Sequence, residues 1–394
     1  MDTKTLLEGI NCTGCLACLD KCPKKCIQSG KDENGFYVPL IDESKCINCH
    51  QCINKCPARI EVPKNKPIKS FVGYIKSEDE YCFSSSGGAF YAFAKYIIKS
   101  NGKVCGVTYD AKENVAKHII INSQEEIIKL QGSKYVQSDT AGIYEKIQQE
   151  LLNGNVVLFS GTPCQIAGLY SVIDSPLREK LFTVEVICHG VSNAEFLKKS
   201  LLQYKRTSGE IQSLRFRNKS KYEKTAFSLR IEYKNGKTII VPAFRDLYYR
   251  MYVDGLFYRK TCYECRYTTR ERMADITLGD CSTYKDYTEL NQERAFSTII
   301  INSKKGDELW EKCKCELEYV TQNMEKEFQH NAQLSHPVVK PENLSEIYSD
   351  YKSLSIDELK KKYVKFKFKE FLNGKIKGCI SLRTRNKLKQ ILKR

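Results

Sequence analysis

The sequence predicts an α+β or α/β protein built from a small cysteine-rich N-terminal module, a larger α/β domain and a basic C-terminal tail. Three observations lead to this prediction: a duplicated cysteine motif near the start, alternating strand and helix patterns in the middle, and Lys and Arg concentrated at the end. The expected boundaries are residues 1–65 for the module, 66–150 and 151–340 for two parts of one domain, and 341–394 for a helical tail.

The composition favours a globular protein of a reducing compartment. Of 394 residues, 41% are hydrophobic, 11% aromatic and 28% charged, which disfavours disordered and fibrous proteins. Met1 is followed by Asp2 and Lys4 and not by a basic-then-apolar leader, and no apolar stretch approaches the roughly 20 residues that span a bilayer. We therefore expect a cytoplasmic protein whose 19 cysteines do not form a disulfide scaffold.

The formal net charge of +17 is concentrated in the tail. Residues 360–394 contain fourteen Lys and Arg and one acid, Glu370, so this segment carries +13 and leaves +4 for the rest. We expect the tail to contact an anionic membrane surface or an acidic partner, with a solvated helical end as the alternative. Basicity alone is poor evidence for a nucleic-acid-binding protein, and no nucleic-acid partner is expected.

Two cysteine motifs in the module are copies of one another. The segment Cys12-Thr-Gly-Cys15-Leu-Ala-Cys18-Leu-Asp-Lys-Cys22-Pro23 recurs 34 positions later as Cys46-Ile-Asn-Cys49-His-Gln-Cys52-Ile-Asn-Lys-Cys56-Pro57. Three thiolates at this spacing hold one 4Fe-4S cluster, and the fourth, followed by proline, ligates the other cluster. We assign Cys12, Cys15, Cys18 and Cys56 to one cluster, and Cys46, Cys49, Cys52 and Cys22 to the other.

The rest of the module is interpreted around these two clusters. Zinc is the alternative metal, but zinc sites pair two Cys-x-x-Cys elements and do not need a triple run with proline. The strand-like stretch 35–41 is expected to cover a cluster and exclude water. We interpret Cys26 as a small buried residue beside a cluster, with a functional thiol as the alternative. The module is thus predicted to be a bacterial dicluster ferredoxin domain.

The body of the chain alternates strand and helix patterns after a linker near residues 61–68. Strands are expected at 71–75, 104–107, 156–159 and 184–187, and helices at 89–99, 140–152, 166–170 and 194–205. This alternation is typical of an α/β domain, in which a cofactor usually lies at the strand ends.

Three loops at such strand ends are candidate sites. Ser84-Ser-Ser-Gly87-Gly88 precedes a predicted helix, so its backbone amides are expected to receive a phosphate, with an ordinary capped helix start as the alternative. Ser160-Gly-Thr-Pro-Cys164-Gln165 and Cys188-His189-Gly190 follow two neighbouring predicted strands. Thiols at such loops favour metal or redox chemistry over core packing, which remains the alternative.

A third metal site is predicted from cysteines far apart in the sequence. Cys164 and Cys188 end neighbouring strands, and further thiols and arginines follow them: Cys262, Cys265, Cys281, Arg266, Arg270 and Arg272. The arginines are expected to lower the thiol pKa values and to balance the charge of a cluster. We assign a third 4Fe-4S cluster to Cys164, Cys188, Cys262 and Cys265, with Cys281 as the competing fourth ligand and zinc as the competing metal.

Seven segments together resemble a known family. They are Ser85-Ser-Gly-Gly88, Gly132-Ser-Lys-Tyr-Val-Gln-Ser138, Gly161-Thr-Pro-Cys-Gln-Ile-Ala-Gly168, Cys188-His-Gly-Val191, Phe216-Arg-Asn-Lys219, Cys262-x-x-Cys265 and Ala274-Asp-Ile-Thr-Leu-Gly-Asp280. The chain resembles the coenzyme F420 hydrogenase/dehydrogenase beta-subunit family, in a form with an N-terminal dicluster ferredoxin domain. The family often has a bulky aromatic residue where this chain has Cys281, so we leave Cys281 outside the third cluster.

The resemblance implies a flavin-binding α/β domain that holds FAD. The residues implied for FAD lie in three segments: Ser85, Ser86, Gly87 and Gly88; Lys134, Gln137 and Ser138; Gly161, Thr162, Pro163 and Gln165. Lys134 is expected to neutralise a phosphate or the flavin N1 region, and Gln165 to hydrogen-bond the ring edge. His189 is the candidate catalytic acid or base, with a structural role as the alternative.

The resemblance also implies an oxidoreductase that passes electrons between clusters and a small-molecule redox substrate, coenzyme F420 or another two-electron compound. Clusters transfer single electrons, whereas a flavin exchanges one or two. We expect a ferredoxin-type carrier or a partner oxidoreductase subunit at the other end of the path, with either direction of flow. The alternative is a non-catalytic electron-transfer subunit that delivers electrons from ferredoxin to a partner enzyme.

Overall fold

The computed structural model describes residues 2–219 and 227–364 of the chain. Most of the basic tail, residues 365–394, lies outside the described residues, and with it the segment expected to contact a membrane or an acidic partner. No helix within the described ranges is both long enough and apolar enough to cross a bilayer.

The N-terminal module repeats its backbone as well as its cysteines. Its elements are α1 (Thr3–Leu7), α2 (Ala17–Asp20), β1 (Ile27–Lys31), β2 (Tyr37–Ile41) and α3 (Gln51–Asn54). α2 and α3 lie 34 positions apart, and each follows a residue in the left-handed conformation, Leu16 at φ 57° and His50 at φ 58°. β1 and β2 form an antiparallel hairpin with Ile27 opposite Ile41. The duplicated sequence therefore folds into two matching turns.

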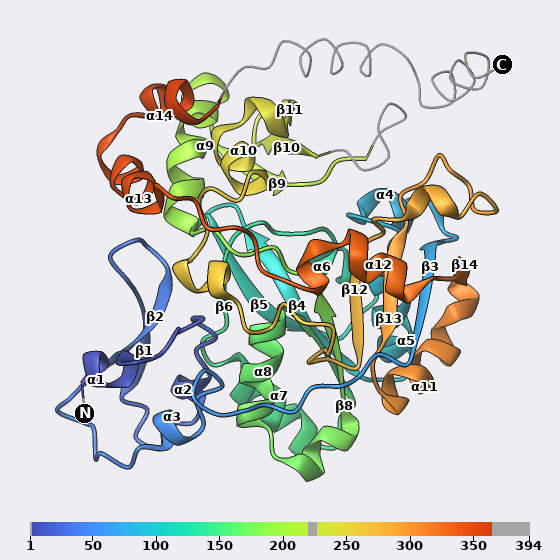
Figure 1. The fold of residues 1–394 in the computed structure, drawn as a ribbon, viewed down its shortest axis with the longest axis horizontal. Helices are drawn as coiled ribbons and strands as arrows, with labels where there is room; N and C mark the ends of the chain where they lie inside the picture. Colours follow the sequence, from blue (N-terminus) through green and yellow to red (C-terminus); the bar gives the residue numbers. More distant parts are fainter. Residues whose placement is uncertain (1, 220–226, 365–394) are drawn as a thin grey trace.

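A nine-stranded mixed sheet forms the centre of the molecule (Figure 1). Its strands, in spatial order, are β14 (Leu317–Thr321), β3 (Lys69–Ile75), β13 (Ser297–Ile301), β12 (Ile276–Asp280), β8 (Leu181–Val186), β7 (Val157–Gly161), β4 (Lys103–Asp110), β5 (Val115–Ile121) and β6 (Ser138–Asp139). The neighbours β12, β8, β7 and β4 run parallel. Their carboxyl ends therefore meet at one edge, where α/β proteins bind cofactors.

Helices cover both faces of this sheet. They are α4 (Glu78–Phe83), α5 (Ala89–Lys99), α6 (Ile127–Leu130), α7 (Ile143–Leu152), α8 (Pro163–Val172), α11 (Lys304–Cys313) and α12 (Met324–His330). Alternate residues of β7 enter different cores: Leu158 packs with α5 and α11, whereas Val157 and Phe159 pack with α7 and α8. Because successive side chains of a strand point to opposite faces, α5 and α11 lie on one side of the sheet and α7 and α8 on the other.

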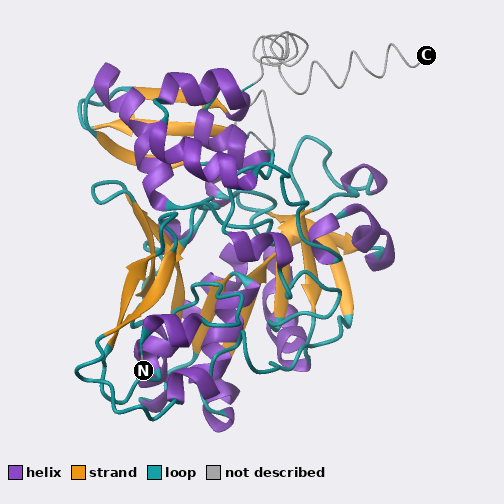
Figure 2. Cartoon of the chain, turned by 60° about the vertical axis from the view of Figure 1, so that its left-hand side comes forward, coloured by secondary structure: helices purple, strands orange, loops and turns teal. Residues whose placement is uncertain are grey.

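A smaller layer of helices on a three-stranded sheet stands above the large sheet (Figure 2). It consists of α9 (Ala194–Ser208), β9 (Ile211–Arg215), β10 (Ser228–Tyr233), β11 (Thr238–Pro242), α10 (Leu247–Val253), α13 (Leu344–Ser353) and α14 (Ile356–Tyr363). Its core is rich in fully buried aromatic rings, among them Phe196, Phe216, Tyr248 and Tyr249. The sequence did not predict this second sheet.

The predicted mixed α/β fold is confirmed. The four predicted strands correspond to β3, β4, β7 and β8, and the helix expected at 89–99 is α5. The helix expected at 140–152 begins later, at Ile143, because Gly142 at φ 72° caps it. The helix expected at 166–170 begins earlier, at Pro163, because Thr162 and Gln165 form a capping box ahead of it.

Candidate functional site: three cysteine-lined cavities and a larger one

Two cavities in the N-terminal module are each surrounded by four of the duplicated cysteines. The inner cavity is lined by Cys12, Cys15, Cys18 and Cys56. The outer cavity is lined by Cys22, Cys46, Cys49 and Cys52, together with Cys26. Each cavity thus receives three thiols from one copy of the motif and the fourth from the other copy. β2 covers both, since Pro39 lines the inner cavity and Ile41 the outer one.

The inner cavity lies against the α/β domain. Arg259 Nε and Thr261 Oγ1 each donate a hydrogen bond to the Cys12 carbonyl at 2.8 Å, and Thr140 Oγ1 donates to the Cys15 carbonyl at 2.8 Å. α2 also packs on α8, where a Cβ added at Gly168 would lie 3.2 Å from both Cys15 Cβ and Cys15 Sγ. The domain therefore holds the backbone of the first cysteine motif directly.

A third cavity brings together Cys164, Cys188, Cys262 and Cys265. Cys164 lies in the first turn of α8 and Cys188 follows β8, while the other two come from the short helix Lys260–Glu264 and the residue after it. Cys281 does not line this cavity; its Sγ lies 3.7 Å from Thr283 Oγ1 and 3.9 Å from Glu327 Oε2. The four thiols assigned from sequence therefore surround one space without Cys281.

Burial keeps the third-cavity thiols neutral in the absence of a metal. It raises the pKa of Cys164 to about 11 and that of Cys262 to about 12, and it raises the pKa values of Cys188 and Cys265 as well. Metal coordination deprotonates a thiol outright, because the cation supplies the charge that the buried site lacks. These thiols are thus suited to a metal and not to free thiolate chemistry.

Of the three arginines expected to lower these pKa values, only Arg272 does so, at Cys265. Arg270 pairs with Glu325 on the surface, and Arg266 donates to the carbonyls of Pro57 and Ala58. Only Arg272 lines the third cavity, and its effect on Cys265 is smaller than that of burial.

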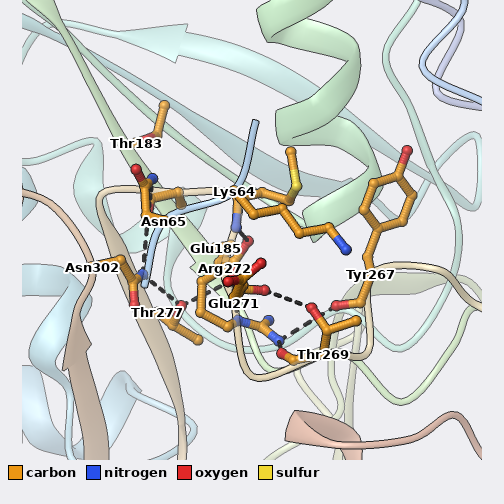
Figure 3. A network of polar contacts seen from close by, with 12 residues as sticks. Lys64, Asn65, Thr183, Glu185, Tyr267, Thr269, Glu271, Arg272, Thr277 and Asn302 are labelled. Carbon is orange, nitrogen blue, oxygen red and sulfur yellow. Dashed lines mark hydrogen bonds and ion pairs between the residues drawn. The ribbon is translucent and has the colours of Figure 1, made fainter. Parts of the chain in front are cut away.

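Arg272 belongs to a buried network beneath the third cavity (Figure 3). The side chains of Arg272 and Glu185 are 1% and 0% exposed, and Arg272 Nε lies 2.5 Å from Glu185 Oε1. Thr277 Oγ1 donates to the same carboxylate at 2.9 Å, and Arg272 Nη1 donates to the Thr269 carbonyl at 2.8 Å. The backbones of Arg272 and Asn65 also bond to each other in both directions, at 2.7 and 2.8 Å. The expected linker at 61–68 is therefore hydrogen-bonded, through Asn65, to a residue that lines this cavity.

A large cavity of about 560 Å³ lies at the carboxyl ends of β7, β8 and β12 and at the N-terminus of α5. Its volume is in the range of small-molecule and cofactor sites. The residues that line it include the loop residues Ser85, Ser86 and Gly88, the strand-end residues Ser160, His189 and Asp280, and the aromatic residues Tyr135, Tyr252 and Tyr258. It therefore occupies the edge where the sequence placed a cofactor.

The residues implied for FAD divide into two groups. Ser85, Ser86 and Gly88 line the large cavity, and Gly87 stands between them, where a Cβ would lie 2.2 Å from the Gly73 carbonyl oxygen. The remaining residues do not line it: Lys134, Gln137, Ser138, Gly161, Thr162, Pro163 and Gln165. Thr162 and Pro163 line the third cavity instead.

The side chains of the second group bond to nearby protein groups. Lys134 Nζ donates to the Leu130 and Gln131 carbonyls near the end of α6, and burial lowers its pKa to about 7. Gln165 Oε1 accepts from the Thr162 amide, and its Nε2 donates to Ser138 Oγ at 2.9 Å. Gln137 Oε1 accepts from the Tyr37 amide in the N-terminal module at 2.9 Å. These side chains thus hold loops of the α/β domain in place, and Gln137 also holds the N-terminal module against that domain. The sequence had instead implied that they contact the flavin.

Three of the four cavities adjoin one another through shared residues. Thr13 lines both the inner and the third cavity, and His189 and Gln333 line both the third and the large cavity. Burial lowers the pKa of His189, so its imidazole is neutral near pH 7.

Comparisons with known proteins agree with this arrangement. Residues 154–327 match the family model for the C-terminal part of the beta subunit of coenzyme F420 hydrogenase/dehydrogenase, and residues 11–60 match the 4Fe-4S dicluster domain. The chain is related to these beta subunits and carries an N-terminal ferredoxin domain. This confirms the family resemblance and makes the chain an iron–sulfur electron-transfer protein related to an oxidoreductase family. No curated protein matches it.

The chain also has a distant structural likeness to a solved structure. It is to a chain of the xenon-derivatized F420-reducing [NiFe] hydrogenase complex from Methanosarcina barkeri, with 18% identity, a TM-score of 0.47, and coverage of 77% of this chain and 94% of that one.

Two residues that line the large cavity of this chain, Arg217 and Gln333, had no role assigned to them from the sequence. Arg217 lines the large cavity, and its Nη1 donates to Asp280 Oδ2 at 2.9 Å and to the Tyr135 hydroxyl at 3.0 Å. The segment Phe216–Lys219 was recognised as a motif, which is the signal that points to it. Gln333 gives no such signal, because it follows α12 in a segment without a motif.

Proposed function

We propose that the protein is an FAD-dependent iron–sulfur oxidoreductase that passes electrons between a ferredoxin-type carrier, or a partner oxidoreductase subunit, and coenzyme F420 or another small two-electron substrate. The observation that supports this most strongly is the order of the cavities. Cys22 lines the outer cavity and Cys18 the inner one, Thr13 joins the inner to the third, and His189 joins the third to the large cavity. Such a row suits stepwise electron transfer.

The cysteine cavities fit 4Fe-4S clusters. Each offers at least four thiols from separated positions, which is the donor set of a cubane. Within residues 2–219 and 227–364, no three His, Cys, Asp or Glu side chains converge closely enough for a single metal ion. The ligand sulfurs of a cubane bind four different irons and stand further apart than those around one zinc ion. We therefore favour a third 4Fe-4S cluster over zinc on Cys164, Cys188, Cys262 and Cys265.

The large cavity fits a flavin. The N-terminus of the 11-residue helix α5 and the turn before it line one side, and backbone amides at a helix N-terminus favour phosphate groups. The rings of Tyr135, Tyr252 and Tyr258 line the cavity as surfaces against which a flat ring system can pack. A bound flavin would exchange single electrons with clusters and two electrons with a substrate.

His189 is the candidate for proton handling in this cavity. It lines the space on the side of the third cavity, and an imidazole carries two ring nitrogens through which it can accept and donate a proton. A His189→Gln variant that retains iron and flavin but loses substrate turnover would support this role. Unchanged turnover would leave His189 with a structural role.

Anaerobic purification with iron, sulfide and flavin analysis tests the proposal. We expect about twelve irons and one FAD per chain, since each 4Fe-4S cluster holds four irons. Cys262→Ala should lose about four irons and keep the flavin, because Cys262 does not line the large cavity. Cys281→Ala is the matched control, a buried cysteine that lines none of the cysteine cavities, and it should keep all of its iron. A colourless protein would overturn the proposal.

Turnover with the purified chain separates an enzyme from an electron-transfer subunit. An enzyme should reduce or oxidise coenzyme F420, or a substitute two-electron acceptor, when it is supplied with a one-electron carrier and no other protein. A chain whose flavin is reduced by the carrier but which turns over no acceptor would instead be the non-catalytic subunit.

A further inference from the structure

The outer cavity is surrounded by five thiols, although a 4Fe-4S cluster takes four. The fifth belongs to Cys26, whose side chain is buried, with 4% of the residue exposed. Cys26 Sγ lies 3.3 Å from Cys22 Sγ, and Cys46 lines the same cavity. The position of Cys26 is therefore that of a ligand and not that of a distant neighbour.

The backbone holds Cys26 in this place. The Lys25 amide donates to the Cys22 carbonyl at 3.1 Å, which closes a turn between the two cysteines. Lys25 has φ 48°, a left-handed conformation that costs a residue with a side chain roughly 1 kcal/mol. The Cys26 carbonyl then accepts from the Asp42 amide at 2.8 Å, which joins the turn to the β1–β2 hairpin. The turn is thus bound on both sides, so Cys26 faces the cavity.

The internal repeat supplies a comparison within the same chain. The position equivalent to Cys26, 34 residues later, is Ile60. After Cys56 the chain continues as a helical turn, with the Arg59 and Ile60 amides both bonded to the Cys56 carbonyl, and Ile60 packs against the α/β domain. Ile60 does not line the inner cavity. The spare thiol is therefore a property of the outer site alone.

We propose that Cys26 is an alternative ligand of the outer cluster that replaces Cys22 at the same iron, a proposal that rests on the clusters of the proposed function. In the exchange, the Fe–S bond to Cys22 breaks, the Fe–S bond to Cys26 forms, and the proton of the Cys26 thiol moves to the Cys22 sulfur. No electron is gained or lost. Because the two sulfurs are 3.3 Å apart, rotation of the two side chains accomplishes the exchange without movement of the backbone.

The outer site is where a spare ligand has most effect. Its ligand Cys49 is exposed, and Ile47 beside it is 56% exposed, so water and oxidants reach this cluster first. A cluster that loses one thiolate bond loses iron, unless another thiol takes the open position. Cys26 provides that thiol from within the cavity.

Three variants of the full chain test the proposal by iron and sulfide content after anaerobic purification. Cys22→Ala and Cys26→Ala should each keep the iron content of the unmodified protein, because one of the two thiols remains. The double variant should lose about four irons, and Cys56→Ala, in the inner site without a spare thiol, should lose about four by itself. Loss of iron from Cys22→Ala to the level of the double variant would overturn the proposal.

A second measurement uses Cys26→Ala alone, a change that leaves all four ligands assigned from sequence. Iron release to a chelator in air should be several-fold faster than from the unmodified protein, and Cys82→Ala, at an exposed cysteine of α4, should release iron at the unmodified rate. Equal rates for Cys26→Ala and the unmodified protein would contradict the role of Cys26. Absence of iron from the unmodified protein would instead refute the proposed function.

Discussion

The inner and outer cavities are built from two copies of one motif, yet their surroundings differ. Around the inner cavity, Arg259, Thr261 and Thr140 of the α/β domain donate hydrogen bonds to the carbonyls of the first motif. The residues that line each cavity all belong to the module, but the outer cavity has an exposed ligand, Cys49. Duplication therefore supplies two equivalent sets of ligands, and docking decides which set faces the domain and which faces solvent.

The outer face also differs in its charge. Exposed lysines lie close to the outer-cavity ligands in the sequence: Lys24, Lys25, Lys45 and Lys55. Lys25 pairs with Glu145 and Lys45 with Asp42. If the carrier of the proposed function is acidic, the lysines of this face should raise the rate at which it associates.

The largest difference between the two cavities should appear in a Cys56→Ala variant. The inner cavity stands between the outer and the third, so loss of its cluster should remove about four irons and stop reduction of the flavin by a one-electron carrier. Reduction of the flavin by a two-electron substrate should continue, since that step does not use the module. Stopped-flow absorbance measures both rates. Flavin reduction by the carrier at the unmodified rate would show that the inner site lies outside the path.

A smaller effect should follow when the contact between the α/β domain and the first cysteine motif is weakened. Arg259→Ala removes charged donors from the Cys12 and Tyr37 carbonyls, and its side chain is buried, so we expect a loss of about 3 kcal/mol in the free energy of unfolding. Arg59→Ala is the control: this exposed arginine also donates to two carbonyls, but within the module, and it should cost under about 1 kcal/mol. Denaturant titration measures both. Equal losses would contradict docking as the source of the difference.

The smallest effect should come from the charge of the outer face. Lys24→Glu with Lys55→Glu should slow association with an acidic carrier by about tenfold at low salt, and the difference should vanish at high salt. Iron content should not change. The control reverses two exposed lysines on helices of the α/β domain, Lys99→Glu in α5 and Lys312→Glu in α11. If both pairs of substitutions slow association with the carrier equally, the rate depends on the net charge of the protein and not on the outer face.

Local patterns explain what the sequence predicted. The assignments of the eight module cysteines rest on spacings of two and three residues, and the four predicted strands of the large sheet rest on short apolar runs, so both follow from local sequence alone. The direction of a polar side chain depends on its neighbours in space. Gln137 bonds to Tyr37, which lies 100 positions away, and no local pattern foretells that pairing. The three-stranded sheet was missed, although Leu229, Ile231 and Tyr233 of β10 alternate with polar residues and its strands are as long as β7 and β8.

Gly168 bears on the rate of electron transfer along the proposed path. It faces Cys15 across the boundary between α8 and the module, and a single added methyl group would meet Cys15 Sγ at 3.2 Å. Electron tunnelling weakens exponentially with the gap that it crosses. The absence of a side chain at Gly168 thus keeps α8 close to Cys15. Successively larger residues at this position should widen the gap and slow electron transfer step by step.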